Sequence, residues 1–337
     1  MPVMTYREAL NDALHREMAR DLSVFVCGED VSGGAGGTSG EREASGGIFG
    51  VTAGLLPKFG QDRVIDTPIS ENAIVGLAVG ASLAGKRGVA EIMFADFLGL
   101  ALDQTMNQAA KFRYMSGGAM SCPVVVRAPY GGGMNMAAQH SQTMYQIATS
   151  VPGLKVALPA TPADAKGLLA SAIRDDDPVV LFEHKAMYGR KGEVPEGDHL
   201  TPFGEARLVR EGDAATVIAL GRMVLFAEKA LDALAADGIA CDLIDPRTTS
   251  PLDEDAILDS VEKTGRVVVV DECPPRCSLA SDIAGFVASH GFSSLQAPVE
   301  QVTAPHAPVP FAKELERAYV PGPADVEAAV RRVVAYR

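Results

Sequence analysis

The chain has 337 residues, 47% of them apolar, a length that suggests about two domains. Its formal net charge is −13 at pH 7, which argues against nucleic acid and anionic membrane surfaces as partners. The same charge suits a partner protein that is basic. No uncharged run has the length and hydrophobicity of a membrane span, so we expect no part of this sequence in a membrane.

The N-terminus and the cysteines indicate a cytoplasmic protein. Residues 1–21 have the pattern of a charged amphipathic helix and lack the basic start and leucine-rich middle of a signal peptide. The five cysteines are scattered along the chain, as is typical of reduced thiols. Cys273 and Cys277 stand close together, but without a second ligand pair they do not predict a metal site.

Strand and helix patterns alternate along the first part of the chain. Short apolar runs are typical of strands buried on both faces, and they lie at 24–27, 63–66, 89–93, 123–127, 155–158 and 179–182. Helices are predicted between them at 71–84, 98–115 and 162–174. The alternation predicts a parallel sheet covered by helices.

A stretch rich in glycine, proline and charge, residues 189–208, interrupts this pattern. Strands then return at 215–221, 239–245, 266–272 and 297–305, with helices at 223–236, 253–263 and 278–289. We therefore predict an α/β protein of two domains. The first spans residues 1–190, a linker spans 191–205, and a smaller α/β domain spans 206–337.

The segment 31–50 is unusually rich in glycine. It follows a strand, which raises the question of a dinucleotide-binding fingerprint. The glycine pattern breaks at Ser39, and charged residues intervene before any helix. A surface loop is therefore the better interpretation, and the sequence leaves the role of the insertion at 31–47 open.

The segment DTPISENAIVGLAVGASLAG, residues 66–85, carries Glu71 at the start of a long uncharged run. One interpretation is a first-turn carboxylate that the helix dipole favours. The other is a catalytic acid, because the carboxylate follows a strand end, where open α/β sheets bind their ligands. Small residues at 76, 80 and 84 would let another backbone or subunit approach this helix.

Two further groups stand near Glu71 in the expected topology. Met93 and Phe97 follow the next strand, and they fit either core packing or an apolar wall against a flat heterocycle. His140, in AAQHSQ, follows the glycines at 131–133. It fits either an ordinary surface histidine or a catalytic residue on a loop after a strand.

These motifs together resemble one family over nearly the whole chain. FVCGEDV, RVIDTPISE, YMSGG, AAQHSQ, PGLKV, DAKGLL and DPVVLFEHK occur in order. They are similar to stretches of the beta subunits of the thiamine diphosphate-dependent dehydrogenase component of 2-oxo acid and acetoin dehydrogenase complexes. The resemblance implies a transketolase-like fold, with a pyrimidine-binding domain first and a transketolase C-terminal-like domain second.

The resemblance also implies roles for the candidate residues. Glu71 would hydrogen-bond N1′ of the aminopyrimidine of thiamine diphosphate and relay the proton that activates C2 of the thiazolium. Phe97 and Met93 would form the wall beside the pyrimidine, and Glu29 of GEDV would be a second acid near the cofactor. His140 would handle protons of the reaction intermediate and of the lipoyl group.

The partners follow from what the sequence lacks. This family holds the diphosphate through Mg²⁺, with a Gly-Asp-Gly motif and an asparagine supplying hard oxygen ligands. The chain has no Gly-Asp-Gly and no asparagine after Asn135. We therefore expect an alpha subunit to complete the site in an alpha2beta2 heterotetramer. The alternative is a non-catalytic assembly protein that keeps the fold.

The resemblance implies a second partner, a lipoyl-bearing acyltransferase core with a small basic domain that docks on the C-terminal domain. Acidic candidates for docking are Asp253, Glu254, Asp255, Glu314, Glu316, Asp325 and Glu327. The substrate stays open between acetoin, pyruvate and a branched-chain 2-oxo acid. PRTTSPLDEDAILDSVEKTGRVVVVDE and VTAPHAPVPF are more similar to acetoin-type subunits, whereas Ser150, ECPPRC and PYGGGMNM depart from the usual family pattern.

The resemblance also implies a binding site for a monovalent cation. The stretch RDDDPVV, residues 174–180, is similar to a family loop that binds potassium largely through main-chain carbonyls. Asp175 and Asp177 are the candidate residues. The alternative is an acidic turn between a helix and a strand.

Overall fold

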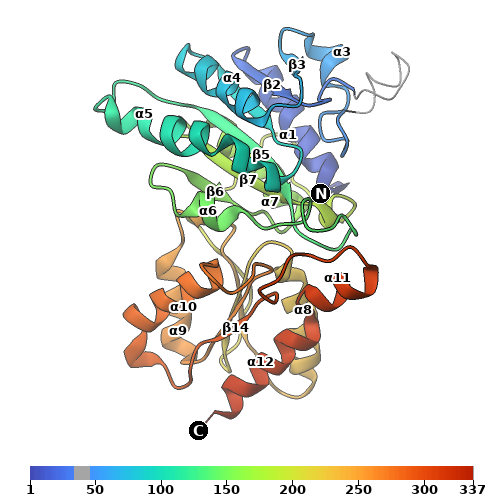
Figure 1. Cartoon of the computed structure of the whole chain (residues 1–337). Helices are drawn as coiled ribbons and strands as arrows, with labels where there is room; N and C mark the ends of the chain where they lie inside the picture. The colour runs from blue at the N-terminus through green and yellow to red at the C-terminus, as the bar shows by residue number, and fades with distance from the viewer. Residues whose placement is uncertain (34–45, 337) are drawn as a thin grey trace. The chain divides into compact units, whose positions relative to one another are not determined.

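The computed structural model describes residues 1–33 and 46–336 (Figure 1). It divides into two compact units, one of residues 1–130 with 147–203, the other of residues 131–146 with 204–337. Most of the glycine-rich insertion, at 34–45, lies outside the described residues, so the loop expected there stays a prediction.

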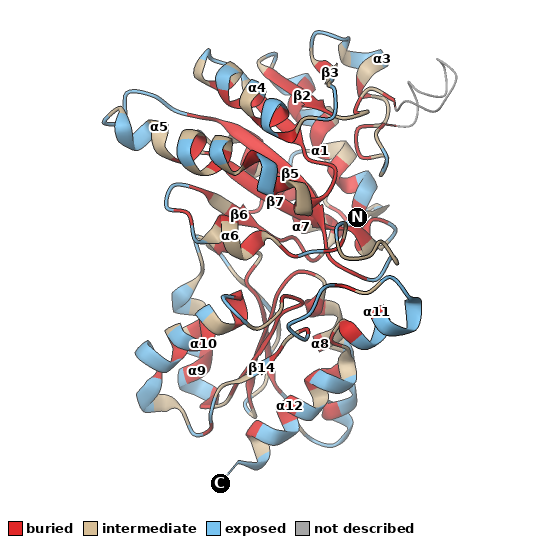
Figure 2. Ribbon diagram, in the orientation of Figure 1, coloured by how far each residue is buried: buried red, intermediate tan, exposed pale blue. Residues whose placement is uncertain are grey.

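The first unit is built on a parallel sheet, and the predicted α/β architecture is confirmed. Its strands run in the order β6-β7-β5-β4-β2-β3, and each neighbouring pair is parallel. The strands are β2 (Val24–Gly28), β3 (Val64–Asp66), β4 (Arg87–Glu91), β5 (Val124–Tyr130), β6 (Lys155–Ala157) and β7 (Val179–His184). The continuous apolar runs are buried, as Figure 2 shows in red, because helices cover the sheet.

Among the described residues, the α-helices that lie wholly or partly in this unit are α1 (Tyr6–Arg20), α3 (Leu55–Phe59), α4 (Glu71–Leu83), α5 (Ala110–Met115), α6 (Tyr145–Thr149) and α7 (Pro162–Arg174). Helix α7 begins where the sequence predicts, because the Thr161 hydroxyl accepts the N–H of Asp164 and proline occupies the first turn. Helix α1 begins with a capping box between Thr5 and Glu8 and packs against α7.

The helix expected at 98–115 is not regular. A 3-10 helix spans Ala95–Ala101 and a π-helix spans Asp103–Ala109, followed by α5. The hydroxyl of Thr105 donates to the carbonyls of Ala101 and Leu102, at 3.2 and 3.1 Å. Such local side-chain bonds compete with the regular helical ladder.

Two short strands lie within the N-terminal residues and the stretch expected to be a linker. β1 (Val3–Thr5) pairs antiparallel with β8 (Lys191–Glu193). Both strands are partly exposed, so they lack the apolar run that marks the central strands. A 3-10 helix, Lys185–Met187, precedes β8.

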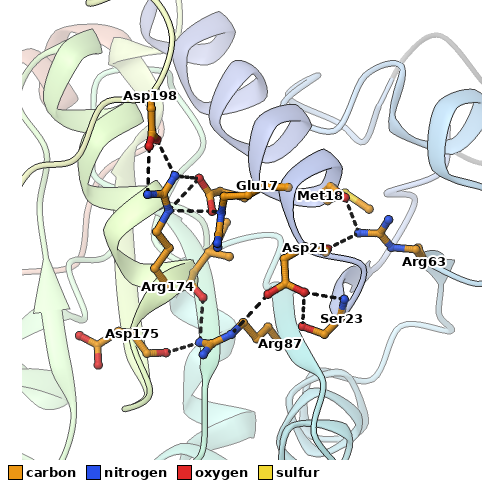
Figure 3. A network of polar contacts seen from close by, with 11 residues as sticks. Glu17, Met18, Asp21, Ser23, Arg63, Arg87, Arg174, Asp175 and Asp198 are labelled. Carbon is orange, nitrogen blue, oxygen red and sulfur yellow. Dashed lines mark hydrogen bonds and ion pairs between the residues drawn. The ribbon is translucent and has the colours of Figure 1, made fainter.

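A polar network ties α1 and α7 to the amino ends of the strands (Figure 3). Arg174 on α7 bonds Glu17 of α1 and Asp198, with closest contacts of 2.7 and 2.5 Å. Arg87, the first residue of β4, donates to the carbonyl of Asp175 at 2.7 Å. The opposite edge of the sheet, at the carboxyl ends, is therefore left for the candidate site.

The second unit contains a mixed sheet in the order β14-β13-β10-β11-β9, in which only β9 is antiparallel to its neighbour. The strands of this unit are β9 (Arg207–Arg210), β10 (Thr216–Ala219), β11 (Asp242–Asp245), β12 (Thr248–Ser250), β13 (Val267–Val270) and β14 (Glu300–Val302). β12 lies outside this sheet. The restart of the strand and helix alternation after residue 206 is confirmed by these elements.

Helices cover both faces of this second sheet. They are α8 (Met223–Ala236), α9 (Glu254–Thr264), α10 (Leu279–His290), α11 (Lys313–Tyr319) and α12 (Pro323–Ala335), with a 3-10 helix at Phe292–Ser294. Figure 1 shows α9 and α10 on one side of the sheet, with α8 packed beside α12 on the other. Throughout residues 1–33 and 46–336, no helix is both long and apolar enough to cross a membrane.

Candidate active site

Three consecutive strands of the first unit end at the same edge of the sheet. The register pairs Gly28, the last residue of β2, with Asp66 of β3 and Glu91 of β4. The segments that leave these strands therefore start side by side. They carry Glu29, Glu71, and the pair Met93 and Phe97. The sequence places Glu71, Met93 and Phe97 after strands, where parallel sheets bind their ligands, and the family resemblance adds Glu29.

Glu71 is the first residue of α4, and only 7% of it is exposed. The preceding residue, Ser70, makes no side-chain capping bond, so the Glu71 carboxylate is the acidic group at this helix N-terminus. Near it in the chain, the hydroxyl of Thr67 is buried and has no hydrogen-bond partner among the residues described. Buried polar atoms are normally bonded, so this hydroxyl suits a ligand or a partner chain.

Glu29 is half-buried on the segment after β2. Burial raises its pKa above the ordinary value, and the negative charges of Asp30 and Glu71 raise it further. The charge of Glu71 acts on Glu29, so the two carboxyl groups lie near each other. An acid whose pKa is raised is a candidate for holding and exchanging a proton, and here that acid is Glu29.

Met93 and Phe97 differ in their surroundings. Met93 is buried, whereas Phe97 keeps part of its ring exposed. The Phe97 ring packs edge to face on Phe94, with ring centroids 5.8 Å apart, and Phe94 packs in the same way on Phe49 at 5.7 Å. Aromatic packing therefore fixes the Phe97 ring, which stays partly exposed, as an apolar wall beside a flat ligand would be.

A buried charge network behind this edge was missed by sequence reasoning. Arg127 is 0% exposed and forms a two-bond ion pair with Glu183, with N···O distances of 2.6 and 2.7 Å, and it also pairs with Glu91. Tyr188 donates its hydroxyl hydrogen to Glu183 at 2.7 Å. Burial raises the pKa of Glu91, and the charge of Arg127 opposes that rise.

The network joins three neighbouring strands, since Glu91, Arg127 and Glu183 lie on β4, β5 and β7. Tyr188 follows the 3-10 helix after β7. The network is next in sequence to the segment that carries Met93 and Phe97. The sequence did contain a signal for this network. Each of the three apolar strands carries one charged residue of the network, which is Glu91 in EIM, Arg127 in VVVRAP and Glu183 in VVLFEHK.

His140 lies on the loop 131–146, which belongs to the second unit, whereas Glu29, Glu71, Met93 and Phe97 belong to the first. His140 is half-buried, and its backbone N–H donates to the carbonyl of Ala137 at 3.4 Å. The next residue, Ser141, has a buried hydroxyl without a hydrogen-bond partner among the described residues. The loop therefore presents a histidine beside an unsatisfied polar atom, a combination suited to binding a ligand.

The aspartates of the expected potassium loop lie at the amino-end edge of the first sheet, before β7. Lys155 contacts Asp175 at 2.6 Å, and Arg113 contacts Asp177 at 2.5 Å. Both carboxylates thus have cationic partners within the chain, and the potassium site stays a prediction. Over the described ranges, 1–33 and 46–336, no group of three or more His, Cys, Asp or Glu side chains could hold a metal ion.

All five cysteines are free thiols, and four of them are buried. Burial raises the pKa of Cys27 and Cys273 to about 12 and that of Cys122 and Cys241 to about 11. These four thiols therefore stay protonated near neutral pH and behave as small core residues.

Models of two protein families match the chain. The transketolase pyrimidine-binding domain matches residues 3–191, and the transketolase C-terminal domain matches residues 204–326. A solved structure described as "Split gene transketolase, inactive beta4 tetramer" has a TM-score of 0.78 and 24% identity, with 99% of each chain covered. That likeness shows the fold alone. The class is therefore a two-domain transketolase-like protein.

Curated relatives narrow this class. The chain is 52% identical to "Acetoin:2,6-dichlorophenolindophenol oxidoreductase subunit beta" of Cupriavidus necator, covering 98% of this chain and 97% of the relative. It is 45% identical to "2-oxoisovalerate dehydrogenase subunit beta" of Bacillus subtilis, covering 100% of both. The chain belongs to the family of beta subunits of thiamine diphosphate-dependent acetoin and 2-oxo acid dehydrogenases.

Proposed function

We propose that this chain is the beta subunit of an acetoin dehydrogenase and that it binds the aminopyrimidine half of thiamine diphosphate. The observation that carries this proposal is the buried Glu71 at the start of α4, with Glu29 close enough to interact with it, at the carboxyl-end edge of a parallel sheet. The greater identity to an acetoin-type subunit than to a 2-oxoisovalerate-type one favours acetoin as the substrate.

The residues present fit the pyrimidine half of the cofactor. A buried carboxyl, an unpaired buried Thr67 hydroxyl and a partly exposed Phe97 ring offer a proton site, a hydrogen-bonding group and an apolar face. They do not include a hard-ligand set for Mg²⁺, and we propose that an alpha subunit supplies those ligands in an alpha2beta2 heterotetramer. A potassium ion near Asp175 and Asp177 belongs to the same proposal.

The bound cofactor would supply a nucleophilic carbon that adds to the substrate carbonyl. In the proposed mechanism, Glu71 holds a proton at N1′ of the aminopyrimidine and exchanges it there. The low exposure of its carboxyl excludes competing water. Glu29 binds beside it as an acid that burial keeps closer to its protonated form. His140 moves protons to and from the substrate and the lipoyl acceptor.

The acyl group then passes to lipoamide on an acyltransferase core, which we propose docks on exposed acidic residues of the second unit. One residue of the acidic set predicted from the sequence is wrong for this role: Glu316 is buried. It points its carboxylate at backbone N–H groups within the unit, so it offers no surface charge. Among the exposed acids of the set are Glu254, Asp255, Glu314 and Asp325.

We propose that the protein acts in the cytoplasm, because its free thiols suit a reducing compartment.

The test is reconstitution of the chain with its alpha subunit, followed by assays of cofactor binding and substrate turnover. We expect tight cofactor binding only in the mixture, and lipoamide-dependent turnover of acetoin above that of pyruvate and 2-oxoisovalerate. Faster turnover of pyruvate or 2-oxoisovalerate would instead assign the chain as the beta subunit of a 2-oxo acid dehydrogenase, which is the second candidate function. A mixture that binds no cofactor would favour a non-catalytic assembly protein.

A further inference from the structure

The loop that carries His140 is held by two buried carboxylates of its own unit. Glu316 of α11 is 3% exposed; its Oε1 accepts the N–H of Gly133 at 2.8 Å, and its Oε2 accepts the backbone N–H and the Nδ2 hydrogen of Asn135 at 2.9 and 3.0 Å. Glu272, which follows β13 and is buried as well, accepts the N–H of Gly132 at 2.5 Å.

Backbone geometry shows how tightly this part of the loop is fixed. Gly133 has a φ of +94°, and a Cβ placed there would lie 2.5 Å from Nη1 of Arg222. The same Nη1 donates to the carbonyl of Gly132 at 3.2 Å. Asn135 has a φ of +56°, a left-handed conformation that a short polar side chain tolerates. The path through 132–135 is therefore held by the N–H groups that donate to Glu316 and Glu272 and by the bond from Arg222.

The far end of the loop has its own anchor. Tyr145 donates its hydroxyl hydrogen to Oδ1 of Asp271, which is fully buried. Asp271 also accepts the N–H groups of Cys273 and Ala280, at 2.9 and 3.2 Å. His140 stands between the two anchors, ten residues or fewer from either, on a segment of the second unit that has no regular secondary structure.

Fold stability alone does not account for a carboxylate at position 316. Helix α11 is short, and its buried residues are Glu316 and Tyr319. Burying a carboxylate has a large desolvation cost, and a well-packed apolar side chain at such a position is often neutral or stabilising by comparison. Three N–H donors offset that cost only because the loop takes this one path, since charge-assisted bonds are strong and directional.

We propose that Glu316 and Glu272 are positioning residues for His140, holding its loop in the conformation in which the imidazole reaches the lipoyl-transfer step. This inference rests on the proposed role of His140. It assigns a purpose to two acids on the C-terminal unit that are separated from the loop by about 140 and 180 residues of chain. A flexible loop would leave the histidine misplaced, and an error of about 1 Å in such placement lowers a rate by about 100-fold.

The experiment uses the heterotetramer reconstituted with its alpha subunit and free lipoamide as the acceptor, so docking does not enter. Glu316→Gln keeps the size of the side chain but replaces the carboxylate, whose two oxygens both accept N–H groups, with an amide that has only one oxygen. Glu262→Gln is the matched control, because it makes the same charge change in the same unit at an exposed position of α9. Two rates are measured: exchange of the cofactor C2 proton, which depends on Glu71, and acyl transfer to lipoamide.

For Glu316→Gln we expect at least a 10-fold fall in kcat for acyl transfer, with C2 exchange within about twofold of wild type. Glu262→Gln should match wild type in both rates. On a His140→Ala background, Glu316→Gln should cause no further loss, because it acts through the histidine. Tyr145→Phe, which removes one hydroxyl at the far anchor, is a second variant in case Glu316→Gln does not assemble.

Three results would overturn the inference: full acyl transfer in Glu316→Gln, an equal loss of both rates, or an undiminished further loss on the His140→Ala background. The proposed role of His140 is tested separately, with the single variant His140→Ala. Acyl transfer at the wild-type rate in this variant would show that His140 does not have that role. In that case the positioning role has no target and is withdrawn with it.

Discussion

Replacing Arg127 by methionine tests the buried network behind the candidate site. Arg127 is 0% exposed and pairs with Glu91 and Glu183, which are themselves buried. Methionine fills similar space but leaves two carboxylates without their cation. Breaking a buried pair in this way costs about 3–5 kcal/mol, a large part of the roughly 5–15 kcal/mol that stabilises a typical domain.

The expected loss depends on pH. Burial already raises the pKa of Glu91, and the variant removes the attraction that opposes this rise. A carboxyl whose folded-state pKa lies above its unfolded value, about 4.3, stabilises the fold fully only below that unfolded value. That contribution is lost as the pH rises through the folded-state pKa. The difference between variant and wild type should therefore be smaller at pH 5 than at pH 8.

Urea unfolding of the beta chain, followed by circular dichroism at both pH values, measures this difference. Arg113→Met is the matched control, because Arg113 pairs with Asp177 at 2.5 Å at a partly exposed position. Its cost should stay within about 1 kcal/mol. A loss of less than 1 kcal/mol in Arg127→Met, or a loss that does not change between pH 5 and 8, would refute the reasoning.

Three other predictions follow from the structure. Gly88→Val should lower stability by about 1–3 kcal/mol in urea unfolding, because a Cβ there would lie 2.9 Å from Cβ of Ala78 on α4; a neutral effect would contradict that packing. Exchanging potassium for a large organic cation should lower the melting temperature if the loop at 174–180 binds the ion, and an unchanged value rejects the site. Binding of the heterotetramer to the isolated basic domain of the acyltransferase core should weaken as salt rises to roughly 0.5 M, where the screening length falls to about 4 Å, and should disappear on deletion of 200–337. Affinity that stays flat with salt would show that the exposed acids of the second unit are not the docking site.

Local patterns were enough to predict most of the central elements. The buried strands of both sheets are continuous apolar runs, and α7 starts at a threonine-proline pair that caps it in the structure. The candidate residues Glu29, Glu71 and Phe97 follow neighbouring strand ends because parallel register brings those ends together. Sequence reasoning reached Glu71, Met93 and Phe97 from their places after predicted strands, and the family resemblance added Glu29.

The rest depended on contacts between distant residues. Arg127 meets Glu91 and Glu183 across 36 and 56 positions, and no local pattern states which buried charges will pair. Glu316 looked like one of several surface acids, yet the fold turns it toward residues more than 180 positions earlier. β1 and β8 were missed because their pairing is short and partly exposed.

The central claim is that Glu71 exchanges the proton that activates the cofactor. The direct measurement is the rate of C2 proton exchange by NMR after acid quench, in the reconstituted heterotetramer with wild-type chain or Glu71→Gln. The amide keeps a hydrogen-bonding group but cannot relay a proton, so the account predicts cofactor retained and exchange slowed by at least about 100-fold. Near-normal exchange in Glu71→Gln, with the fold and the assembly intact, would contradict it.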